Sequence, residues 1–221
     1  MQTRIRLIDV SHVVEDGMVT YKGLPAPIIC DWRSREESRV IYDGAEFQIG
    51  KVEMVANTGT YVDSPFHRYA HGKDLSELPL ESVANLECVV VRVDPAKGPA
   101  IDAMPLTDRE VSGKAVLFHT GWDRLWRTDA YFESHPHLTG RLAEKLAKAG
   151  AALVGIDSMN IDSIATGARP VHTILLGNEI PIVEHLCGLA AVPPSGGRFS
   201  AVPVKVKGCG TFPVRAYVAV R

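Results

Sequence analysis

The segment Asn57–His67 constrains this chain more than any other stretch. It gathers short polar side chains, a carboxylate and an imidazole around one Gly and one Pro. Asp63 and His67 are four residues apart, but Pro65 between them disfavours a continuous helix. We therefore expect a loop or a bulged strand end, where the backbone can direct side chains toward a ligand. By residue type alone, the pair fits either a catalytic site or a polar turn followed by a surface His.

A second pair of chemically active residues lies far along the chain. His172 precedes the apolar run Thr173–Leu176, and Glu184 follows an apolar run that starts at Ile180. Neutral imidazole and carboxylates together suit Zn²⁺ or Mn²⁺. His172 can also simply end a strand, and Glu184 can simply face solvent. The pattern predicts a metal site only if folding brings both residues to Asp63.

Strand-like segments outnumber helical ones, which indicates a β-rich α/β fold. One amphipathic helix is clear, because Thr139 can cap its start and Gly150 can end it. A second helix is expected to begin near Pro181 and to reach Leu186. The expected strands are Arg4–Val10, Leu86–Val93, Lys114–Thr120, Ala151–Asp157, Phe199–Lys207 and Phe212–Val220, the last two forming a hairpin around Gly208-Cys209-Gly210.

Composition is typical of a globular enzyme and excludes several other classes. Of the 221 residues, 46% are hydrophobic and 23% are charged, and the net charge of -2 offers no basic field for nucleic acid or an anionic membrane. No apolar run approaches the roughly 20 residues of a membrane span. The N-terminus lacks the apolar core of a signal peptide. The four Cys are widely spaced, so we expect reduced thiols and a cytoplasmic location.

The segment 57–67 resembles the motif His-x-Gly-Thr-His-x-Asp-x-Pro-x-His of the cyclase superfamily of metal-dependent hydrolases. This superfamily includes bacterial-type kynurenine formamidases and isatin hydrolases. The chain departs from the motif at Asn57 and Tyr61, where the family has His. The similarity covers nearly the whole chain and rests on Gly59, Thr60, Asp63, Pro65 and His67, on Leu7–His12 and Leu153–Asp157, on the separation of His172 and Glu184, and on Pro213–Ala216.

The resemblance implies a fold and a set of roles. It implies that residues 1–221 form one cyclase-like hydrolase domain, with a β-rich fold like the family's swivelling β/β/α fold. It implies that Asp63, His172 and Glu184 hold a divalent metal and that His67 transfers protons. Three protein ligands with an open position lower the pKa of bound water from about 15.7 to roughly 7. Family members commonly form homodimers or higher homo-oligomers, so the resemblance implies the same here.

The two departures from the motif change the expected metal content. Asn57 offers only a neutral amide oxygen, and the phenol of Tyr61 has a reference pKa of about 10. Both changes remove imidazole donors, so one metal site is expected in preference to two. Tyr61 is then expected to act on the substrate, by steadying a developing oxyanion.

Three interpretations remain open from the sequence. The first is a hydrolase with one Zn²⁺ or Mn²⁺ ion that cleaves an amide, lactam or ester bond of a small cyclic or aromatic carbonyl compound. The second is an acid–base enzyme without metal that uses Asp63, His67 and Tyr61. The third is a catalytically silent homologue that only binds a small molecule. In each, Asn57, Tyr61, Phe66 and Trp122 are expected to contact the ligand, although the aromatic residues among them also suit ordinary core packing.

Overall fold

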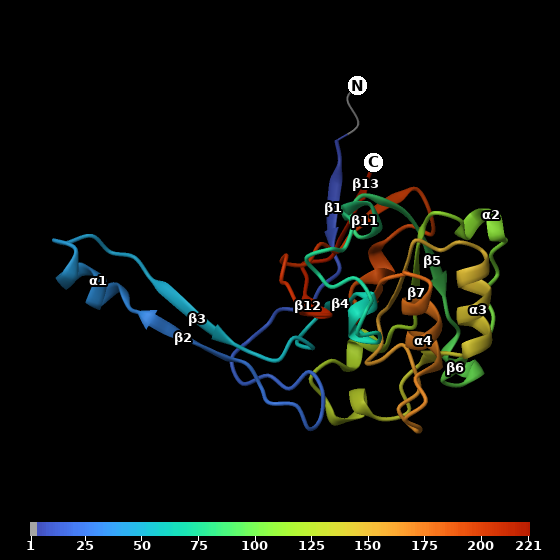
Figure 1. Cartoon of the computed structure of the whole chain (residues 1–221), viewed down its shortest axis with the longest axis horizontal. Coiled ribbons are helices and arrows are strands. Elements are labelled where there is room, and N and C mark those ends of the chain that lie inside the picture. The colour runs from blue at the N-terminus through green and yellow to red at the C-terminus, as the bar shows by residue number, and fades with distance from the viewer. Residues whose placement is uncertain (1–3) are drawn as a thin grey trace.

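The computed structural model describes residues 4–221 and shows a mixed α/β protein built around one large sheet (Figure 1). Within that range nine strands join in the order β1-β13-β11-β5-β7-β9-β10-β4-β12. The strands β5, β7, β9 and β10 run parallel at the centre, and antiparallel strands extend the sheet on both sides. Their bounds are β1 Arg6–Asp9, β4 Tyr61–Asp63, β5 Leu86–Arg92, β7 Ala115–His119, β9 Leu153–Ile156, β10 Ile182–Glu184, β11 Gly197–Ser200, β12 Thr211–Pro213 and β13 Tyr217–Val220.

The sheet separates two hydrophobic cores. Along β7, Leu117 belongs to one core, while its neighbours Val116 and Phe118 belong to the other, as the alternation of a strand requires. Helices α3 (Gly140–Lys148) and α4 (Pro170–Gly177) pack on the second of these faces, which we call the helix-covered face. Loop segments and the short 3₁₀ helix Leu189–Ala191 cover the first face. The helix expected between Thr139 and Gly150 is confirmed as α3, with the Thr139 side chain accepting from the N–H of Leu142.

The first four expected strands are confirmed to within two residues, but one other expectation is wrong and another is only partly right. The segment from Pro181 to Leu186 holds the strand β10, which pairs with β9 and β4 and is buried throughout. A short apolar run fits either element, and tertiary pairing decides. The expected hairpin is only partly right: β11 and β13 do pair antiparallel, with Phe199 opposite Val218, but β11 ends at Ser200. The segment around Gly208-Cys209-Gly210 does not form a tight turn between them, because β12 lies between them in the sequence and pairs with β4.

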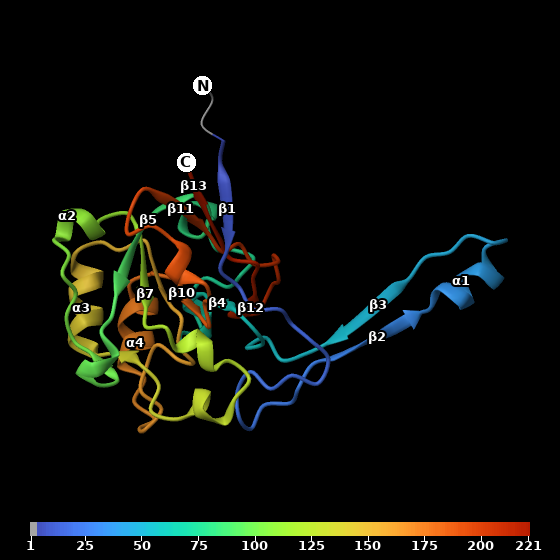
Figure 2. The ribbon, with the colours of Figure 1, turned by 180° about the vertical axis from the view of Figure 1, so that it is seen from behind.

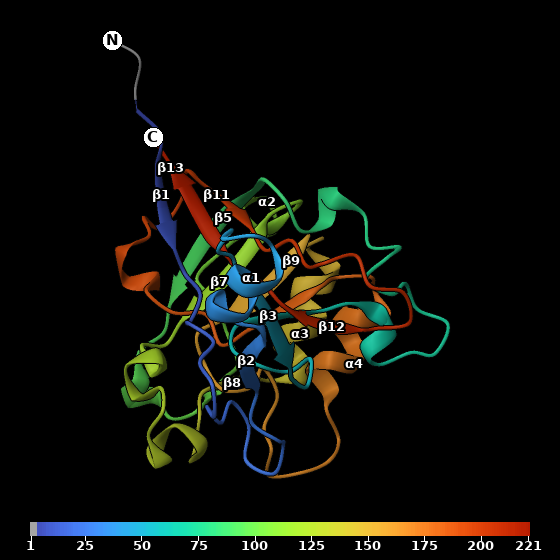
Figure 3. The same ribbon diagram turned by 90° about the vertical axis from the view of Figure 1, so that its left-hand side faces the viewer.

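A separate arm, residues 28–53, projects from the body of the molecule (Figures 1 and 2). It contains β2 (Ile28–Arg33), α1 (Arg35–Ile41) and β3 (Ile49–Glu53), with β2 and β3 paired as an antiparallel ribbon. Ser34 caps α1 reciprocally with Glu37. Figure 3 looks along the arm, with the strands of the large sheet fanned out behind it.

The remaining elements are small. They are α2 (Asp108–Val111), the parallel pair β6 (Ala100–Ile101) and β8 (His137–Leu138), and the 3₁₀ helices Pro65–His67, Leu80–Ser82, Pro95–Lys97, Trp122–Leu125 and Asp129–Phe132. No helix within residues 4–221 combines the length and the apolar character that crossing a membrane demands.

Candidate metal centre

Neighbouring strands carry the polar residues of the site on the helix-covered face. The middle residues of β4 and β10 are valines that belong to the opposite core, so Tyr61, Asp63 and Glu184 point to the helix-covered side. The strand register sets Glu184 directly opposite Tyr61, and Asp63 opposite Thr211 of β12. The Tyr61 hydroxyl donates to Glu184 Oε2 at 2.6 Å. Pairing of short strands therefore assembles two buried carboxylates from distant parts of the sequence.

Helix α4 brings His172 over this face. Pro170 occupies its first turn, and Arg169 precedes it with a φ of 49°. The Asp162 carboxylate accepts the N–H groups of Val171 at 2.8 Å and of His172 at 3.0 Å, which satisfies the start of the helix. Its Oδ2 also accepts the Nδ1–H of His172 at 2.6 Å. This bond leaves the Nε2 lone pair of His172 free for a cation.

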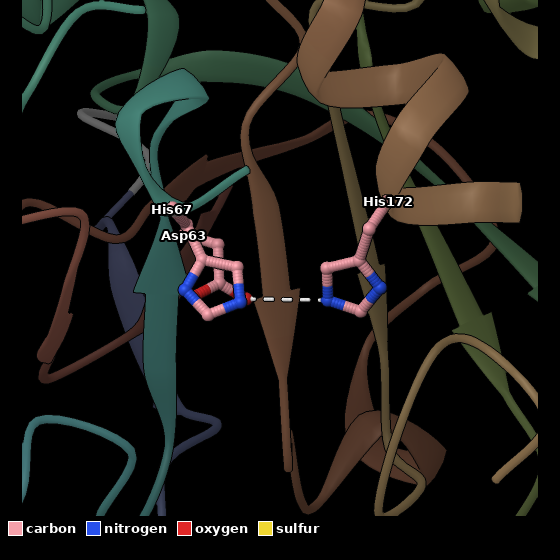
Figure 4. Close-up of side chains that lie close together, drawn as sticks. All are labelled: Asp63, His67 and His172. Atoms are coloured by element: carbon pink, nitrogen blue, oxygen red, sulfur yellow. Dashed lines mark ion pairs between the residues drawn. The ribbon is translucent and has the colours of Figure 1, made fainter. Parts of the chain in front are cut away.

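His67, in the 3₁₀ helix that follows β4, is oriented in a similar way. Thr211 Oγ1 donates to Asp63 Oδ1 in a short hydrogen bond. Because its single hydrogen is used there, Thr211 Oγ1 accepts the Nδ1–H of His67 at 2.8 Å. The Nε2 lone pair of His67 is then free as well. Figure 4 shows the rings of His67 and His172 facing each other beside the Asp63 carboxylate.

The possible metal-binding atoms of these residues lie close together. His172 Nε2 lies 3.7 Å from Asp63 Oδ2 and 3.7 Å from Glu184 Oε1. One ligand atom each of Asp63, His67 and His172 lie within 4.8 Å of one another (Figure 4). Asp63 Oδ2 is buried and has no hydrogen-bond partner among residues 4–221. An orphaned carboxylate oxygen beside free imidazole lone pairs fits a divalent cation.

The pKa shifts of these groups also indicate that the site favours a bound positive charge. Burial raises the pKa of Glu184 to about 7, against the opposing charge of His172. Burial alone would lower the pKa of His172, but the hydrogen bond to Asp162 and the nearby carboxylates of Asp63 and Glu184 raise it to about 10. Burial and the Glu184 charge raise the pKa of Tyr61 well above 10, so its phenol stays protonated. The buried carboxylates therefore require either a proton on His172 or a metal ion.

The centre opens into a cavity of about 410 Å³. Of the residues predicted from the sequence, Asn57, Tyr61, His67, His172 and Glu184 line it. Its other lining residues are Tyr21, Lys22, Gly23, Leu24, Arg68, Asn160 and Arg169.

Phe66 and Trp122 are not among the residues that line this cavity. Phe66 is half-buried, and the half-buried Trp122 donates its indole N–H to the Tyr131 carbonyl at 2.9 Å. A larger cavity of about 660 Å³ lies elsewhere, between residues of β5, β11 and β13, and the metal-centre residues take no part in its lining.

Three residues that shape the site were not predicted from the sequence. Asp162 orients His172, Thr211 links Asp63 to His67, and Arg169 joins the cavity wall. Asp162 stands only ten residues before His172, after the buried strand β9, and an acidic residue at that point was a usable signal. Thr211 carried no signal of its own, because its role depends on the pairing of β12 with β4.

Comparison with known proteins gives consistent matches over the chain. Residues 8–163 match the family model described as "Putative cyclase". A kynurenine formamidase of Salinibacter ruber is 30% identical over 95% of both chains. A kynurenine formamidase of Geobacillus thermodenitrificans is 28% identical, again over 95% of both chains.

Solved structures share the fold at lower sequence identity. Isatin hydrolase A from Labrenzia aggregata superposes with a TM-score of 0.82 at 18% identity, covering 98% of this chain and 94% of that one. Isatin hydrolase A from Ralstonia solanacearum gives a TM-score of 0.80 at 20% identity, covering 98% and 92%. These likenesses establish the strand-rich α/β fold that the sequence predicted.

Proposed function

The chain belongs to the cyclase family, and on that premise we propose that it is a metal-dependent hydrolase of small carbonyl compounds. The bond cleaved is an amide C–N bond, with lactams and esters as related targets, in an aromatic or cyclic compound. N-formyl aryl amines are the first class to try, because the relatives named above include kynurenine formamidases. The observation that carries the proposal is the convergence of Asp63 Oδ2, His172 Nε2 and Glu184 Oε1.

We assign Asp63, His172 and Glu184 as the protein ligands of one divalent ion, Zn²⁺ or Mn²⁺. Two carboxylates balance its charge, and one imidazole adds a nitrogen donor. When bound, such an ion polarises a carbonyl oxygen and makes water a nucleophile near neutral pH. Ligands must be deprotonated to bind, so the ion takes the place of the proton that His172 otherwise holds.

The chain's own residues handle the protons and the orientation of groups. His67 is half-exposed, lines the cavity, and has a free Nε2 lone pair because its Nδ1–H is bound to Thr211. It is placed to accept a proton from the attacking water and return it to the leaving nitrogen. Tyr61 donates its hydroxyl to Glu184 and thereby fixes that carboxylate within the proposed ligand set.

Metal analysis of the purified protein, beside the His172→Ala and Asp63→Asn variants, tests the proposal. We expect about one equivalent of Zn²⁺ or Mn²⁺ in the native protein and none in either variant. His71→Ala is the matched control, since His71 is exposed and takes no part in the cavity lining. Failure of the native protein to take up either ion would favour the acid–base enzyme or the silent binder. Formate release from N-formyl aryl amines then separates those two.

The His67→Ala variant distinguishes two ligand sets that share Asp63 and His172. If His67 transfers protons, the metal content stays and turnover falls about 10²–10⁴-fold. If His67 replaces Glu184 as the third ligand, the metal is lost together with activity. The proximity of Asp63, His67 and His172 makes this variant necessary.

We propose one metal rather than two, because Asn57 and Tyr61 lack imidazole donors. The double variant Asn57→His/Tyr61→His tests this assignment. We expect a second equivalent of metal in the double variant. An unchanged stoichiometry would mean that these positions do not belong to a metal site.

We further propose a homodimer held by the arm. An antiparallel ribbon of two strands is only marginally stable on its own. Yet the arm leaves Trp32 70% and Val40 84% exposed, with further apolar residues at Ile28, Ile41 and Val52. A second copy can cover these exposed apolar residues as part of a standard-sized interface, which buries about 800 Å² on each partner.

Light scattering on a sizing column tests the dimer. We expect the native chain at twice its 24.0 kDa mass and the Trp32→Glu/Val40→Glu variant at the monomer mass. Val204→Glu is the control, because Val204 is also exposed but lies outside the arm. A native protein that elutes as a monomer contradicts the proposal.

A further inference from the structure

The metal-centre cavity has walls of opposite charge. Its buried end carries Glu184 and His172, whereas its more exposed lining includes Lys22, Arg68 and Arg169. Glu184 is the only carboxylate among the lining residues, and its two oxygens already accept bonds from Tyr61 and from the N–H of Ile161. A ligand that fills this cavity therefore meets a metal-binding end and a cationic end.

Arg169 is the best-fixed of the three cations. Its Nη1 donates to Asn160 Oδ1 at 3.1 Å, and its Nη2 lies 3.5 Å from the Tyr21 hydroxyl. Asn160 is itself held, because its Oδ1 also accepts the N–H of Asp162 at 2.9 Å. The Arg169 backbone is left-handed, with φ 49° and ψ 51°, a strained conformation for a residue that is followed by Pro170.

The Arg169 guanidinium has donors to spare. Within residues 4–221 it forms no ion pair with a carboxylate. A guanidinium has five N–H donors, and the bonds to Asn160 and Tyr21 use two of them. The remaining N–H groups form a planar fork of the kind that binds carboxylates through two hydrogen bonds. Lys22 and Arg68 add positive charge to the same lining without comparable fixation.

We propose that Arg169 binds a carboxylate carried by the substrate, while the scissile amide lies at Asp63, His172 and Glu184. This assignment rests on the proposed hydrolase function and narrows its substrate class to anionic carbonyl compounds. A cavity of about 410 Å³ accommodates a small aromatic acid of this kind. Arg169 is thus a specificity residue. It precedes helix α4 directly and lies three positions before the proposed ligand His172.

The competing explanation is that Arg169 only offsets the buried charge of Glu184 and Asp162. Those carboxylates do act on it, since burial lowers the pKa of Arg169 but Tyr21, Glu184 and Asp162 raise it on balance. A purely structural cation would affect every substrate equally. A carboxylate-binding residue affects only substrates that carry the anion, and this difference makes the two explanations separable.

The test uses formanilide and the three isomers of formamidobenzoate, which differ from formanilide only by a carboxylate. We expect the native protein to prefer one formamidobenzoate isomer. In Arg169→Gln, kcat/KM for that isomer should fall about 10- to 100-fold, because the variant loses hydrogen bonds to a charged group. Most of this fall should come from a higher KM. Formanilide should stay within about twofold, since it lacks the group that Arg169 binds. Arg169→Lys, which keeps the charge but loses the fork, should fall between the two.

Two controls make the outcome decisive. Arg109→Gln removes an exposed guanidinium on α2, outside the cavity, and should change neither substrate. Metal content should be the same in all variants. Equal losses for formanilide and formamidobenzoate in Arg169→Gln, or no preference for the anion in the native protein, overturn the proposal.

A binding measurement separates this proposal from the hydrolase function itself. If the native protein hydrolyses neither compound, the proposed hydrolysis fails, and calorimetric titration with benzoate and benzamide decides the anion site. Benzoate binding at least about tenfold weaker in Arg169→Gln, with benzamide unchanged, supports the carboxylate site. Equal benzoate affinities in the two proteins contradict it.

Discussion

Two groups of histidines lie side by side in this protein, and their buried members have opposite pKa shifts. His172, in the metal centre, has its pKa raised to about 10, whereas burial lowers the pKa of His185 to about 3. Both imidazoles are buried. His172 faces the carboxylates of Asp63, Asp162 and Glu184, while His185 packs against aromatic rings. Neighbouring charge, not burial, therefore decides which histidine can serve a metal site.

The second group of histidines lies one residue from a proposed ligand. His185 follows Glu184 directly, with a φ of 54°, and its Nδ1 lies 2.8 Å from the Tyr131 hydroxyl. His12 stacks on Trp126 with ring centroids 4.0 Å apart, and burial lowers its pKa to about 4. We call His12, Tyr131 and His185 the aromatic histidine group. Within residues 4–221, three metal-binding side chains converge at Asp63, His67 and His172 and not in this group.

The largest expected effect comes from exchanging Asp63 for Asn and comparing it with His185→Asn. Asp63→Asn keeps the shape but removes the anionic oxygen that faces His172. We expect loss of bound metal and at least a 100-fold loss of turnover, since even outer partners of a metal are worth about 10–100-fold.

His185→Asn is the matched change in the aromatic histidine group, and Asn tolerates the positive φ at this position. It should keep the metal and lose only stability. Metal content and kcat are measured for Asp63→Asn and His185→Asn under the same conditions. A metal loss in His185→Asn equal to that in Asp63→Asn would abolish the distinction between the groups.

Asp162→Asn should have the next largest effect. Asp162 accepts the Nδ1–H of His172, and an amide at this position can present a donor there instead of an acceptor. His172 would then lose its fixed tautomer, so we expect metal affinity to fall about 10–100-fold. Competition of the protein with a coloured chelator measures this affinity. An unchanged affinity would mean that Asp162 serves only to cap helix α4.

Asp63, His172 and Glu184, the ligands expected from the sequence, lie close together in the structure, but the sequence did not indicate the residues that orient them. These three residues were identified through a family resemblance, because the motif and the separation of its residues can be recognised in the sequence without knowing the fold. Asp162 and Thr211 act only through contacts, a helix start and a strand pairing, that no local pattern reports. The same cause explains the error at Pro181–Leu186, where a short apolar run gave no sign of its neighbours β9 and β4.

The arm shows a different limit of sequence reasoning. Segments such as Ile28–Arg33 carry apolar residues that normally predict burial, yet the arm leaves them exposed. Apolar patterning reports which residues avoid water in most proteins, but it cannot report whether one chain folds over them. The confirmed strands Leu86–Arg92 and Ala115–His119 lie at the centre of the sheet, where the same apolar signal is satisfied within one chain.

Acid should destabilise the protein through the aromatic histidine group. The folded pKa of His185, about 3, lies below the unfolded value of 6.5, so the unfolded state binds a proton first as pH falls. Stability is therefore lost as pH falls below 6.5, by about 1.4 kcal/mol per unit for this residue. We expect His185→Asn to lose about 2 kcal/mol less than the native protein between pH 6.5 and 5. Urea unfolding at both pH values measures the difference, and parallel pH dependence in the two proteins would contradict it.

The smallest expected effect concerns Tyr61, which borders both groups. Its ring lies 5.2 Å from that of His185, while its hydroxyl donates to Glu184. Tyr61→Phe removes one hydrogen bond to a ligand carboxylate but leaves the ring packing, so metal content should stay and kcat/KM should fall less than about tenfold. Tyr131→Phe is the counterpart on the other side, because its hydroxyl meets His185 and no proposed ligand. It should leave kcat/KM unchanged, and a fall in Tyr131→Phe as large as that in Tyr61→Phe would show that the two groups function as one.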